Sequence, residues 1–265
     1  MYDSYDRQID YLRISVTDKC NLRCVYCMPA EGVPLRGHEE MLSFEQIRAV
    51  VRAGVGLGIT KVRLTGGEPL VKRGIVGLVK TIREVPGLRH LGMTTNGVLL
   101  EPLAAALRQA GLDSLNISLD TLNPERYRAL TRCGEITRVL AGIEAARVQG
   151  FPIKINTVVL NDTPAEEISA LREFCSQRSL TLQLINHYSL TEEKMDHYKF
   201  DRPPDCSKCN RIRLLADGHL KPCLHSDHEI PLDFGDLEAS LRRAILSKPE
   251  RGSVCSQRSM MEIGG

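Results

Sequence analysis

The chain of 265 residues has no tryptophan, and aromatic residues make up only 5% of it. This scarcity argues against a surface that stacks nucleic-acid bases on aromatic rings. The formal net charge of +2 favours neither nucleic acid nor a membrane surface as a partner. The sequence has no apolar run long enough to span a bilayer, and its polar, acidic first residues do not resemble a secretory signal. We therefore expect a cytoplasmic protein in which particular basic residues account for any anion binding.

Nine cysteines contrast with these absences, and six of them form two triplets. Clustered cysteines in a cytoplasmic protein are more typical of a metal site than of disulfides. The first triplet is Cys20, Cys24 and Cys27, in a Cys-x3-Cys-x2-Cys pattern. Three thiolates on a short loop suit a cubane iron–sulfur cluster in which one iron stays open for a second molecule. The alternative is a zinc site, although zinc prefers paired Cys-x2-Cys units and four protein ligands.

The second triplet consists of Cys206, Cys209 and Cys223. It again has three thiolates, which indicates a second cluster whose open iron could accept a nitrogen or oxygen donor from a substrate. A zinc ribbon with histidine as the fourth ligand is the alternative, because His219 and His225 are near in the sequence.

Basic residues alternate on segments that we expect to be strands. Arg211 and Arg213 are two residues apart, as are Lys61 and Arg63, and Arg13 lies on the first expected strand. Alternate residues of a strand point to the same face, so these side chains would point together into a barrel. Buried cations without partners are costly, and guanidinium groups bind phosphate well. The pattern therefore predicts a polyphosphate site; a solvated strand face is the alternative.

Strand-like and helix-like segments alternate along the first 190 residues, which is typical of an α/β fold with a parallel sheet and helical crossovers. We expect strands at 12–16, 61–65, 90–95, 114–119, 153–160 and 180–185. We expect helices at 44–51, 76–85, 101–110, 135–148 and 164–177, and one that begins at Pro124. Six units are too few for a closed eight-stranded barrel. An open, partial (β/α)6 TIM-like barrel over 1–190 is therefore predicted, with a small C-terminal module over 191–265 that begins with a polar linker at 191–204. A doubly wound sheet is the alternative.

Small and polar residues follow the expected strands, where chemistry collects in barrels of this kind. Gly66 and Gly67 would let the backbone approach a ligand closely, and Glu68 could accept a hydrogen bond from an ammonium group. Thr95 and Ser118, at the ends of the third and fourth strands, would line the same face; ordinary turn chemistry is the alternative. The chain ends in Ile263-Gly264-Gly265, a thin tail able to enter a narrow cavity or, alternatively, a disordered terminus.

Four motifs occur in one order along almost the whole chain: the segment 12–29, the run 61–70, the cysteine–Arg-x-Arg group and the Gly-Gly ending. Together they resemble the molybdenum cofactor biosynthesis protein A family of radical S-adenosylmethionine (SAM) enzymes, the GTP 3′,8-cyclases. The resemblance implies a partial barrel of the radical SAM type. It also implies that a 5′-deoxyadenosyl radical removes a ribose hydrogen from GTP, after which the ribose carbon attacks guanine C8 to give 3′,8-cyclo-7,8-dihydro-GTP.

The same resemblance implies roles for individual residues. Two [4Fe-4S] clusters would be held by the two cysteine triplets, the first binding SAM and the second holding GTP through its base. The expected SAM-site residues are Tyr26, Gly66, Gly67, Glu68, Thr95, Ser118 and Asn156. The expected nucleotide-site residues are Arg13, Lys61, Arg63, Lys154, Arg211, Arg213, Gly264 and Gly265. An electron donor such as flavodoxin or ferredoxin would supply electrons, and a homodimer is an assembly to test.

The chain departs from the family in two ways. Family members are longer between the sixth strand and the second triplet, and Gln183 and Asn186 stand where the family pattern has charged residues. These departures keep two other hypotheses open. One is a paralogue that acts on a different nucleotide or on a peptide, and the other is a non-enzymatic electron-transfer or metal-sensing protein, against which the open first cluster argues.

Overall fold

A computed structural model describes residues 1–32, 37–193, 199–200 and 205–264, except for the side chain of His38. Gly265 and most of the expected linker at 191–204 lie outside the described residues. Within them, the strands form one sheet in the order β6-β5-β4-β3-β2-β1-β7-β8-β9. The strands are β1 (Tyr11–Ser15), β2 (Lys61–Thr65), β3 (His90–Thr95), β4 (Ser114–Ser118), β5 (Ile153–Val159), β6 (Thr181–Asn186), β7 (Arg211–Leu214), β8 (His219–Lys221) and β9 (Ile230–Pro231).

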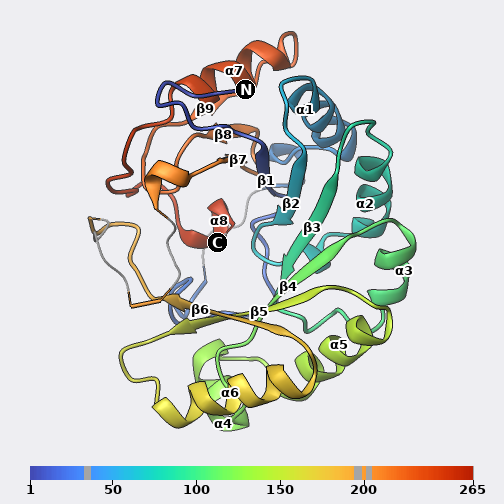
Figure 1. The fold of residues 1–265 in the computed structure, drawn as a ribbon, viewed down its shortest axis with the longest axis vertical. Helices are drawn as coiled ribbons and strands as arrows, with labels where there is room; N and C mark the ends of the chain where they lie inside the picture. The colour runs from blue at the N-terminus through green and yellow to red at the C-terminus, as the bar shows by residue number, and fades with distance from the viewer. Residues whose placement is uncertain (33–36, 194–198, 201–204, 265) are drawn as a thin grey trace.

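The main helices follow the strands in alternation, as the sequence predicts. Most of them lie outside the curved sheet, whereas the short last helix, α8, lies inside the curve (Figure 1). The helices are α1 (Phe44–Gly56), α2 (Ile75–Arg83), α3 (Ala104–Gln109), α4 (Pro124–Thr131), α5 (Ile136–Val148), α6 (Ala165–Gln177), α7 (Leu237–Leu246) and α8 (Met260–Ile263). Three short 3-10 turns add His38–Glu40, Pro69–Val71 and Cys206–Lys208.

Helix α1 illustrates how the sequence builds this outer layer. Ser43 and Gln46 form a reciprocal capping box at its start, which satisfies backbone N–H groups that the first turn would leave unpaired. Ile47, Val50 and Val51 form its buried stripe and pack in the same apolar core as the sheet. Each fully buried side chain of this kind contributes roughly 1.5–3 kcal/mol, so the amphipathic pattern fixes which face meets the sheet.

The parallel part of the sheet confirms the predicted open barrel. Strands β1 to β6 are parallel to their neighbours. Among the described strands, β6 and β9 are the two edge strands and do not pair with each other, so the sheet is not closed. The expected helix at 101–110 begins only at Ala104, because residues 97–103 first form a series of turns.

The segment after Cys209 extends the same sheet. Strand β7 pairs in parallel with β1, and β8 and β9 continue from it in antiparallel order. Helix α7 packs against α1 and against β8 and β9. The division of the chain at residue 190 stays a prediction, but the strands assigned to the small module share one sheet with the barrel. None of the helices in the described ranges has the length and apolar character needed to cross a membrane.

Candidate functional site

The strand register gathers the basic residues on one face of the sheet. Arg13 on β1 is directly opposite Arg63 on β2 and Arg213 on β7. Two residues earlier, Tyr11 is opposite Lys61 and Arg211 in the same way. Residues that share a register position on neighbouring strands point to the same face, so the alternation seen in the sequence becomes two adjacent rows of basic side chains.

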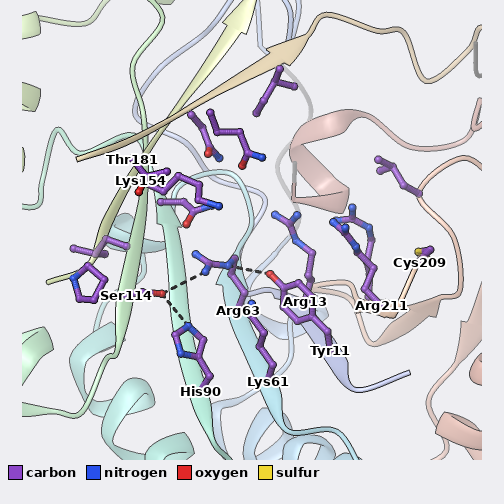
Figure 2. A pocket seen from close by; sticks show the side chains of 18 of the residues that line it. Tyr11, Arg13, Lys61, Arg63, His90, Ser114, Lys154, Thr181, Cys209 and Arg211 are labelled. Atoms are coloured by element: carbon purple, nitrogen blue, oxygen red, sulfur yellow. Dashed lines mark hydrogen bonds between the residues drawn. The ribbon is translucent and has the colours of Figure 1, made fainter. Parts of the chain in front are cut away.

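These rows line a cavity of about 520 Å³, which we call the larger cavity. All six basic residues expected at the nucleotide site line it, and Figure 2 shows several of them reaching into the same space. They are Arg13, Lys61, Arg63, Lys154, Arg211 and Arg213. The cavity is therefore lined by a concentration of positive charge, as a polyphosphate ligand requires.

Three protein groups hold the guanidinium of Arg63. It donates to the Tyr11 hydroxyl at 2.9 Å, to the Met93 carbonyl at 3.0 Å and to Ser114 Oγ at 3.4 Å (Figure 2). A Cβ atom at residue 92 would lie 2.7 Å from an Arg63 nitrogen, so Gly92 makes room for this arrangement. Arg63 is thus fixed in place before any ligand binds.

The electrostatics of the larger cavity reflect this crowding of cations. Burial lowers the pKa of Arg13 and of Arg213, and neighbouring arginines lower both further. Burial alone would raise the pKa of Tyr11, but the cations around it, Arg13 foremost, lower it to about 8. Bound negative charge would relieve the repulsion among these groups.

The second cysteine triplet lies in the wall of the larger cavity. Cys206, Cys209 and Cys223 all line it, although they come from two separate segments, the 3-10 turn 206–208 with Cys209 after it and the residues after β8. His225, one of the two histidines considered as a zinc ligand, lines the same cavity and is buried. His219 instead lies against Asp217, with Nδ1 3.1 Å from Oδ1.

The first triplet lines a smaller cavity of about 210 Å³. Burial raises the pKa of the Cys20 thiol to about 11 and that of Cys27 to about 12. It raises the pKa of Cys24 still further, with Cys27 and other nearby acidic groups adding to the effect. Such crowded thiols become thiolates readily only when a metal centre neutralises them, so the donor set fits an iron–sulfur cluster.

Among the described residues, no three His, Cys, Asp or Glu side chains converge on one point as the ligands of a single metal ion would. The ligands of a cubane cluster need not converge in this way, because each thiolate binds a different iron.

Gly66 and Gly67 hold the loop that carries the first triplet. Gly67 N donates to the Thr17 carbonyl at 2.8 Å, and Glu68 N donates to the Lys19 carbonyl at 2.8 Å. A Cβ atom would lie 2.4 Å from the Thr17 oxygen at position 66 and 2.3 Å from the Lys19 oxygen at position 67. Both glycines line the smaller cavity, and they also permit the close backbone approach to the cysteine loop, while their approach to a ligand stays a prediction.

The Glu68 carboxylate is buried and organises the ends of two strands. It accepts hydrogen bonds from Leu70 N at 2.9 Å, Thr95 Oγ1 at 2.7 Å and Asn96 N at 2.6 Å. Burial raises its pKa to about 7 despite these donors. Asn96 in turn donates to Cys20 Sγ at 3.9 Å and to Asn21 at 2.8 Å. Glu68 thus supports the cysteine loop as well as lining the smaller cavity.

Asp120 is a second buried acid in the smaller cavity, and no role for it was predicted from the sequence. Asp120 lines the smaller cavity, accepts a hydrogen bond from the Tyr26 hydroxyl and accepts another from Val158 N at 2.8 Å. Burial raises its pKa to about 6. Its position just after β4 is the signal that could have identified it, because functional residues collect at strand ends.

The two cavities adjoin each other. Asn156, Ile185 and Tyr188 line both. The buried Oδ1 atom of Asn156 has no hydrogen-bond partner among the described residues, and the same holds for Thr94 Oγ1 in the smaller cavity. Such orphaned buried acceptors are rare unless a ligand or water serves them. Ser118 and Thr95 line the smaller cavity as predicted, whereas Gln183 lines the larger one and Asn186 donates to the Phe200 carbonyl at 2.9 Å.

The end of the chain enters the site. Met260 and Met261 of α8 line the smaller cavity, and the Gly264 carbonyl accepts a hydrogen bond from Arg213 at 2.7 Å. A Cβ atom at position 264 would lie 2.1 Å from Thr65 Oγ1. Specific contacts therefore hold the described part of the tail, as far as Gly264.

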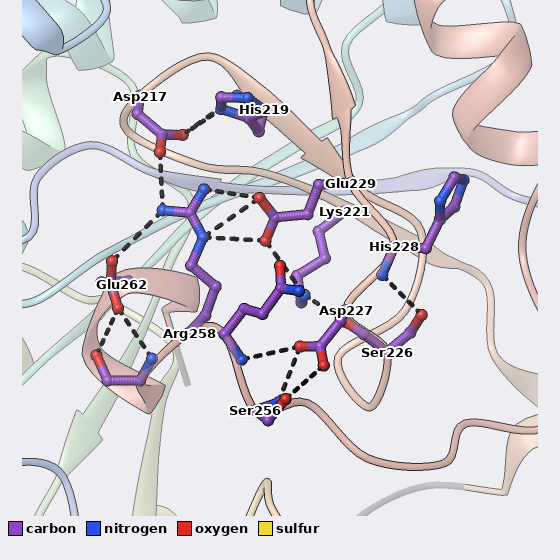
Figure 3. A network of polar contacts seen from close by, with 12 residues as sticks. Asp217, His219, Lys221, Ser226, Asp227, His228, Glu229, Ser256, Arg258 and Glu262 are labelled. Carbon is purple, nitrogen blue, oxygen red and sulfur yellow. Dashed lines mark hydrogen bonds and ion pairs between the residues drawn. The ribbon is translucent and has the colours of Figure 1, made fainter.

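A network of ion pairs anchors this end of the chain (Figure 3). Arg258 contacts Asp217 at 2.8 Å, Glu229 at 2.6 Å and Glu262 at 3.4 Å. Glu229 also pairs with the fully buried Lys221 at 3.3 Å. These contacts join α8 to the loops on either side of β8, which fixes where Gly264 enters the site.

A family model described as the radical SAM superfamily matches residues 14–175. The chain belongs to the radical SAM superfamily. Among solved structures, Streptococcus suis SuiB bound to S-adenosylmethionine has a TM-score of 0.69, with 16% identity over 91% of this chain and 64% of SuiB. Native anSMEcpe with bound AdoMet has a TM-score of 0.66, with 16% identity over 91% of this chain and 81% of that one. The chain thus spans less than two thirds of SuiB, and both likenesses concern the fold alone.

Within the superfamily, curated relatives match the whole chain. The GTP 3′,8-cyclase of Alkaliphilus oremlandii is 40% identical over 322 aligned residues, and that of Moorella thermoacetica is 39% identical over 323; each alignment covers 100% of both proteins. The chain therefore belongs to the GTP 3′,8-cyclase family. Both alignments are longer than the 265 residues of this chain, so the relatives contain residues that it lacks.

Proposed function

We propose that this protein cyclises GTP to 3′,8-cyclo-7,8-dihydro-GTP in molybdenum cofactor biosynthesis, as a radical SAM lyase. The observation that carries the proposal is the larger cavity, which combines six basic side chains with three cysteines and adjoins the smaller cavity that the first cysteine triplet lines. Identity of 40% along the whole chain to a GTP 3′,8-cyclase supports the same reaction.

As a radical SAM enzyme, the protein uses SAM and an iron–sulfur cluster. We propose that Cys20, Cys24 and Cys27 hold this first cluster, and that Cys206, Cys209 and Cys223 hold a second one, the auxiliary cluster. When bound, the first cluster and SAM supply a 5′-deoxyadenosyl radical. The charge of the smaller cavity suits SAM, because the buried acids Glu68 and Asp120 can compensate its positive charge.

The basic residues account for the binding of the triphosphate. Lys61, Lys154 and Arg63 lie at or near the beginnings of their strands, in the part of the larger cavity shown in Figure 2. Phosphate oxygens there would receive charge-assisted hydrogen bonds, which contribute about 1.5–3 kcal/mol each. Arg63 can hold an oxygen without first losing side-chain freedom, because Tyr11 and Ser114 already fix its guanidinium.

The remaining residues orient the nucleotide between the two cavities. With the triphosphate on the basic rows, the base would reach toward the wall that carries Cys206, Cys209 and Cys223, and the ribose toward Asn156 at the junction. The unpartnered Oδ1 of Asn156 is available to accept from a ribose hydroxyl. Met260 and Met261 cover the smaller cavity with apolar surface, which would exclude water from a radical.

The decisive experiment is anaerobic incubation of the cluster-loaded protein with SAM, dithionite and GTP, followed by product analysis. Formation of one 5′-deoxyadenosine for each cyclised GTP would support the proposal. Cleavage of SAM without cyclised GTP, together with turnover of another nucleotide or a peptide, would favour the paralogue instead. Flavodoxin or ferredoxin is the electron donor that we propose to compare with dithionite, and sedimentation of the loaded protein would test for a homodimer.

A further inference from the structure

Lys248 is a buried lysine directly behind the second cysteine triplet, and the reaction proposed above gives it no role. It follows helix α7, two residues beyond Leu246, and only 3% of its surface is exposed. A buried ammonium group is costly unless its donors are satisfied. The hydrogen-bond acceptors of the Lys248 ammonium group therefore indicate its role.

Each of those partners belongs to a segment that carries a cysteine of the triplet. The Lys248 ammonium donates to Cys209 Sγ at 3.5 Å, to the Arg211 carbonyl at 2.8 Å and to the Pro222 carbonyl at 2.9 Å. Arg211 is two residues after Cys209, and Pro222 directly precedes Cys223. An ammonium group has three donors, and here all three are used to join the two segments that supply the ligands.

Arg7 can be compared with Lys248, because it also contacts a cysteine residue of the second triplet. It is also buried, pairs with Asp3 at 2.7 Å, and donates to the Cys206 carbonyl at 2.9 Å. Further donations, to the carbonyls of Pro249 and Glu250, tie the same guanidinium to the chain just after Lys248. Arg7 thus braces a ligand segment through backbone oxygens, whereas Lys248 also contacts a sulfur.

We infer that Lys248 is a positioning residue for the auxiliary cluster, which fixes the spacing of Cys209 and Cys223 and donates a hydrogen bond to the Cys209 sulfur. The inference rests on the proposed second cluster. Hydrogen bonds to ligand sulfurs and local charge set the reduction potential of such clusters. Because the reduced cluster carries more negative charge, a buried cation beside it stabilises the reduced form and raises the potential.

The test uses the full chain with Cys20, Cys24 and Cys27 replaced by Ala, so that only the auxiliary cluster contributes iron and a paramagnetic signal. Lys248→Met keeps most of the length of the side chain but removes its charge and donors, and Lys248→Arg keeps the charge. Lys208→Met is the matched control, because Lys208 is exposed in the turn between Cys206 and Cys209. Arg7→Met removes the brace that does not touch sulfur.

Redox titration followed by electron paramagnetic resonance, and the rate of iron loss to a chelator, are the readouts. We expect Lys248→Met to lower the midpoint potential and to speed iron loss, and Lys248→Arg to restore most of the potential. Arg7→Met should speed iron loss without moving the potential, and Lys208→Met should change neither. Should Lys248→Met fail to fold, Lys248→Gln, which removes the charge but stays polar, takes its place: a lower midpoint potential would support the inference, and an unchanged one would contradict it.

Two outcomes would overturn the inference in distinguishable ways. If the parent chain binds iron but Lys248→Met behaves like Lys208→Met, or shifts the potential no more than Arg7→Met, Lys248 has no role specific to the sulfur. If the parent chain binds no iron at all, the proposed second cluster fails and this inference fails with it.

Discussion

The two adjoining cavities bury charges of opposite sign. In the smaller one the buried charged groups are acidic, and burial raises the pKa of Glu68 to about 7 and of Asp120 to about 6. In the larger one they are basic, and burial with mutual repulsion lowers the pKa of Arg13 and Arg213. In both cavities burial is the main cause of the shift, because it disfavours the charged form of each group.

This difference assigns a ligand of one charge to each cavity before any chemistry is considered. A cationic ligand would relieve the smaller cavity, and an anionic one would relieve the larger. SAM carries positive charge at its sulfonium and amino groups, and GTP carries negative charge on its triphosphate. With SAM and GTP placed as proposed, the shared wall at Asn156, Ile185 and Tyr188 would bring the two ligands together without placing like charges side by side.

The largest expected effect on activity comes from removing a cysteine ligand of the proposed first cluster, in the smaller cavity. Cys24→Ala should abolish SAM cleavage, because a cluster with two thiolates left cannot present its open iron correctly, while the auxiliary cluster remains. Iron content should fall by about half, and 5′-deoxyadenosine should disappear from the products. Cys133→Ser, a change to an exposed cysteine outside the triplet, is the control and should retain the iron. Unchanged SAM cleavage in Cys24→Ala would contradict the assignment of the first cluster.

Next in size is the loss of the chain end, which lies beside both cavities. Deleting Gly264 and Gly265 removes the carbonyl that accepts from Arg213 and should leave that cation free to move. Both clusters should stay, whereas hydrogen abstraction from the nucleotide should be suppressed, as measured by deuterium transfer from labelled GTP to 5′-deoxyadenosine. Gly264→Ala should act in the same direction, since its Cβ would lie 2.1 Å from Thr65 Oγ1. Full cyclisation by both variants would leave the tail without a role.

Substituting one cation of the larger cavity should weaken nucleotide binding while leaving the smaller cavity intact. Arg213→Ala removes a charge-assisted contact of about 1.5–3 kcal/mol, which corresponds to about 10- to 140-fold in affinity. Equilibrium binding of GTP measures this, with iron content and uncoupled SAM cleavage as controls that should stay near normal. Arg213→Lys should recover part of the affinity. Loss of both clusters in Arg213→Ala would instead make Arg213 a structural residue.

The sequence could predict much of this arrangement, but not all of it. Six strands with alternating helices carry a strong periodic pattern, so the grouping of Arg13 with Lys61 and Arg63 on one face was predictable. The pairing of β7 with β1 was not, because β7, β8 and β9 are only four, three and two residues long. Such short strands have no clear period, and their place depends on packing against α7.

The prediction of the site was also limited by single residues that lie far from their partners in the sequence. Lys248 and Arg7 gave no pattern that links them to the second triplet, since their partners are backbone oxygens and one sulfur. Glu68 was predicted to accept from an ammonium group, and that stays a prediction; the three hydrogen bonds that its oxygens accept from the protein were not predicted. Spacing along a chain identifies ligand sets better than it identifies the groups that hold those ligands.

A subtler difference between the cavities should appear in the titration of Tyr11. The cations of the larger cavity hold its pKa at about 8, compared with an ordinary value of 10.0. Because the folded protein releases this proton before the unfolded chain does, the contribution of Tyr11 to the free energy of unfolding rises between about pH 8 and pH 10. The phenolate absorbance of the protein minus that of Tyr11→Phe should show this pKa, and inorganic triphosphate should raise it. An ordinary pKa would mean that the cations are compensated by the protein itself.

The smallest effect should come from adding a cation to the larger cavity rather than removing one. Gln183 lies opposite Asn156 in the register of β5 and β6 and lines the cavity with an uncharged amide. Gln183→Arg should tighten GTP binding several-fold at low salt, with less gain at high salt, because added salt screens the attraction. Gln183→Met tests whether size alone matters and should not tighten binding. The gain should be modest because Arg13, Arg211 and Arg213 already raise the cost of another buried cation. If Gln183→Arg weakens binding instead, the cavity already holds as much positive charge as its ligand can compensate.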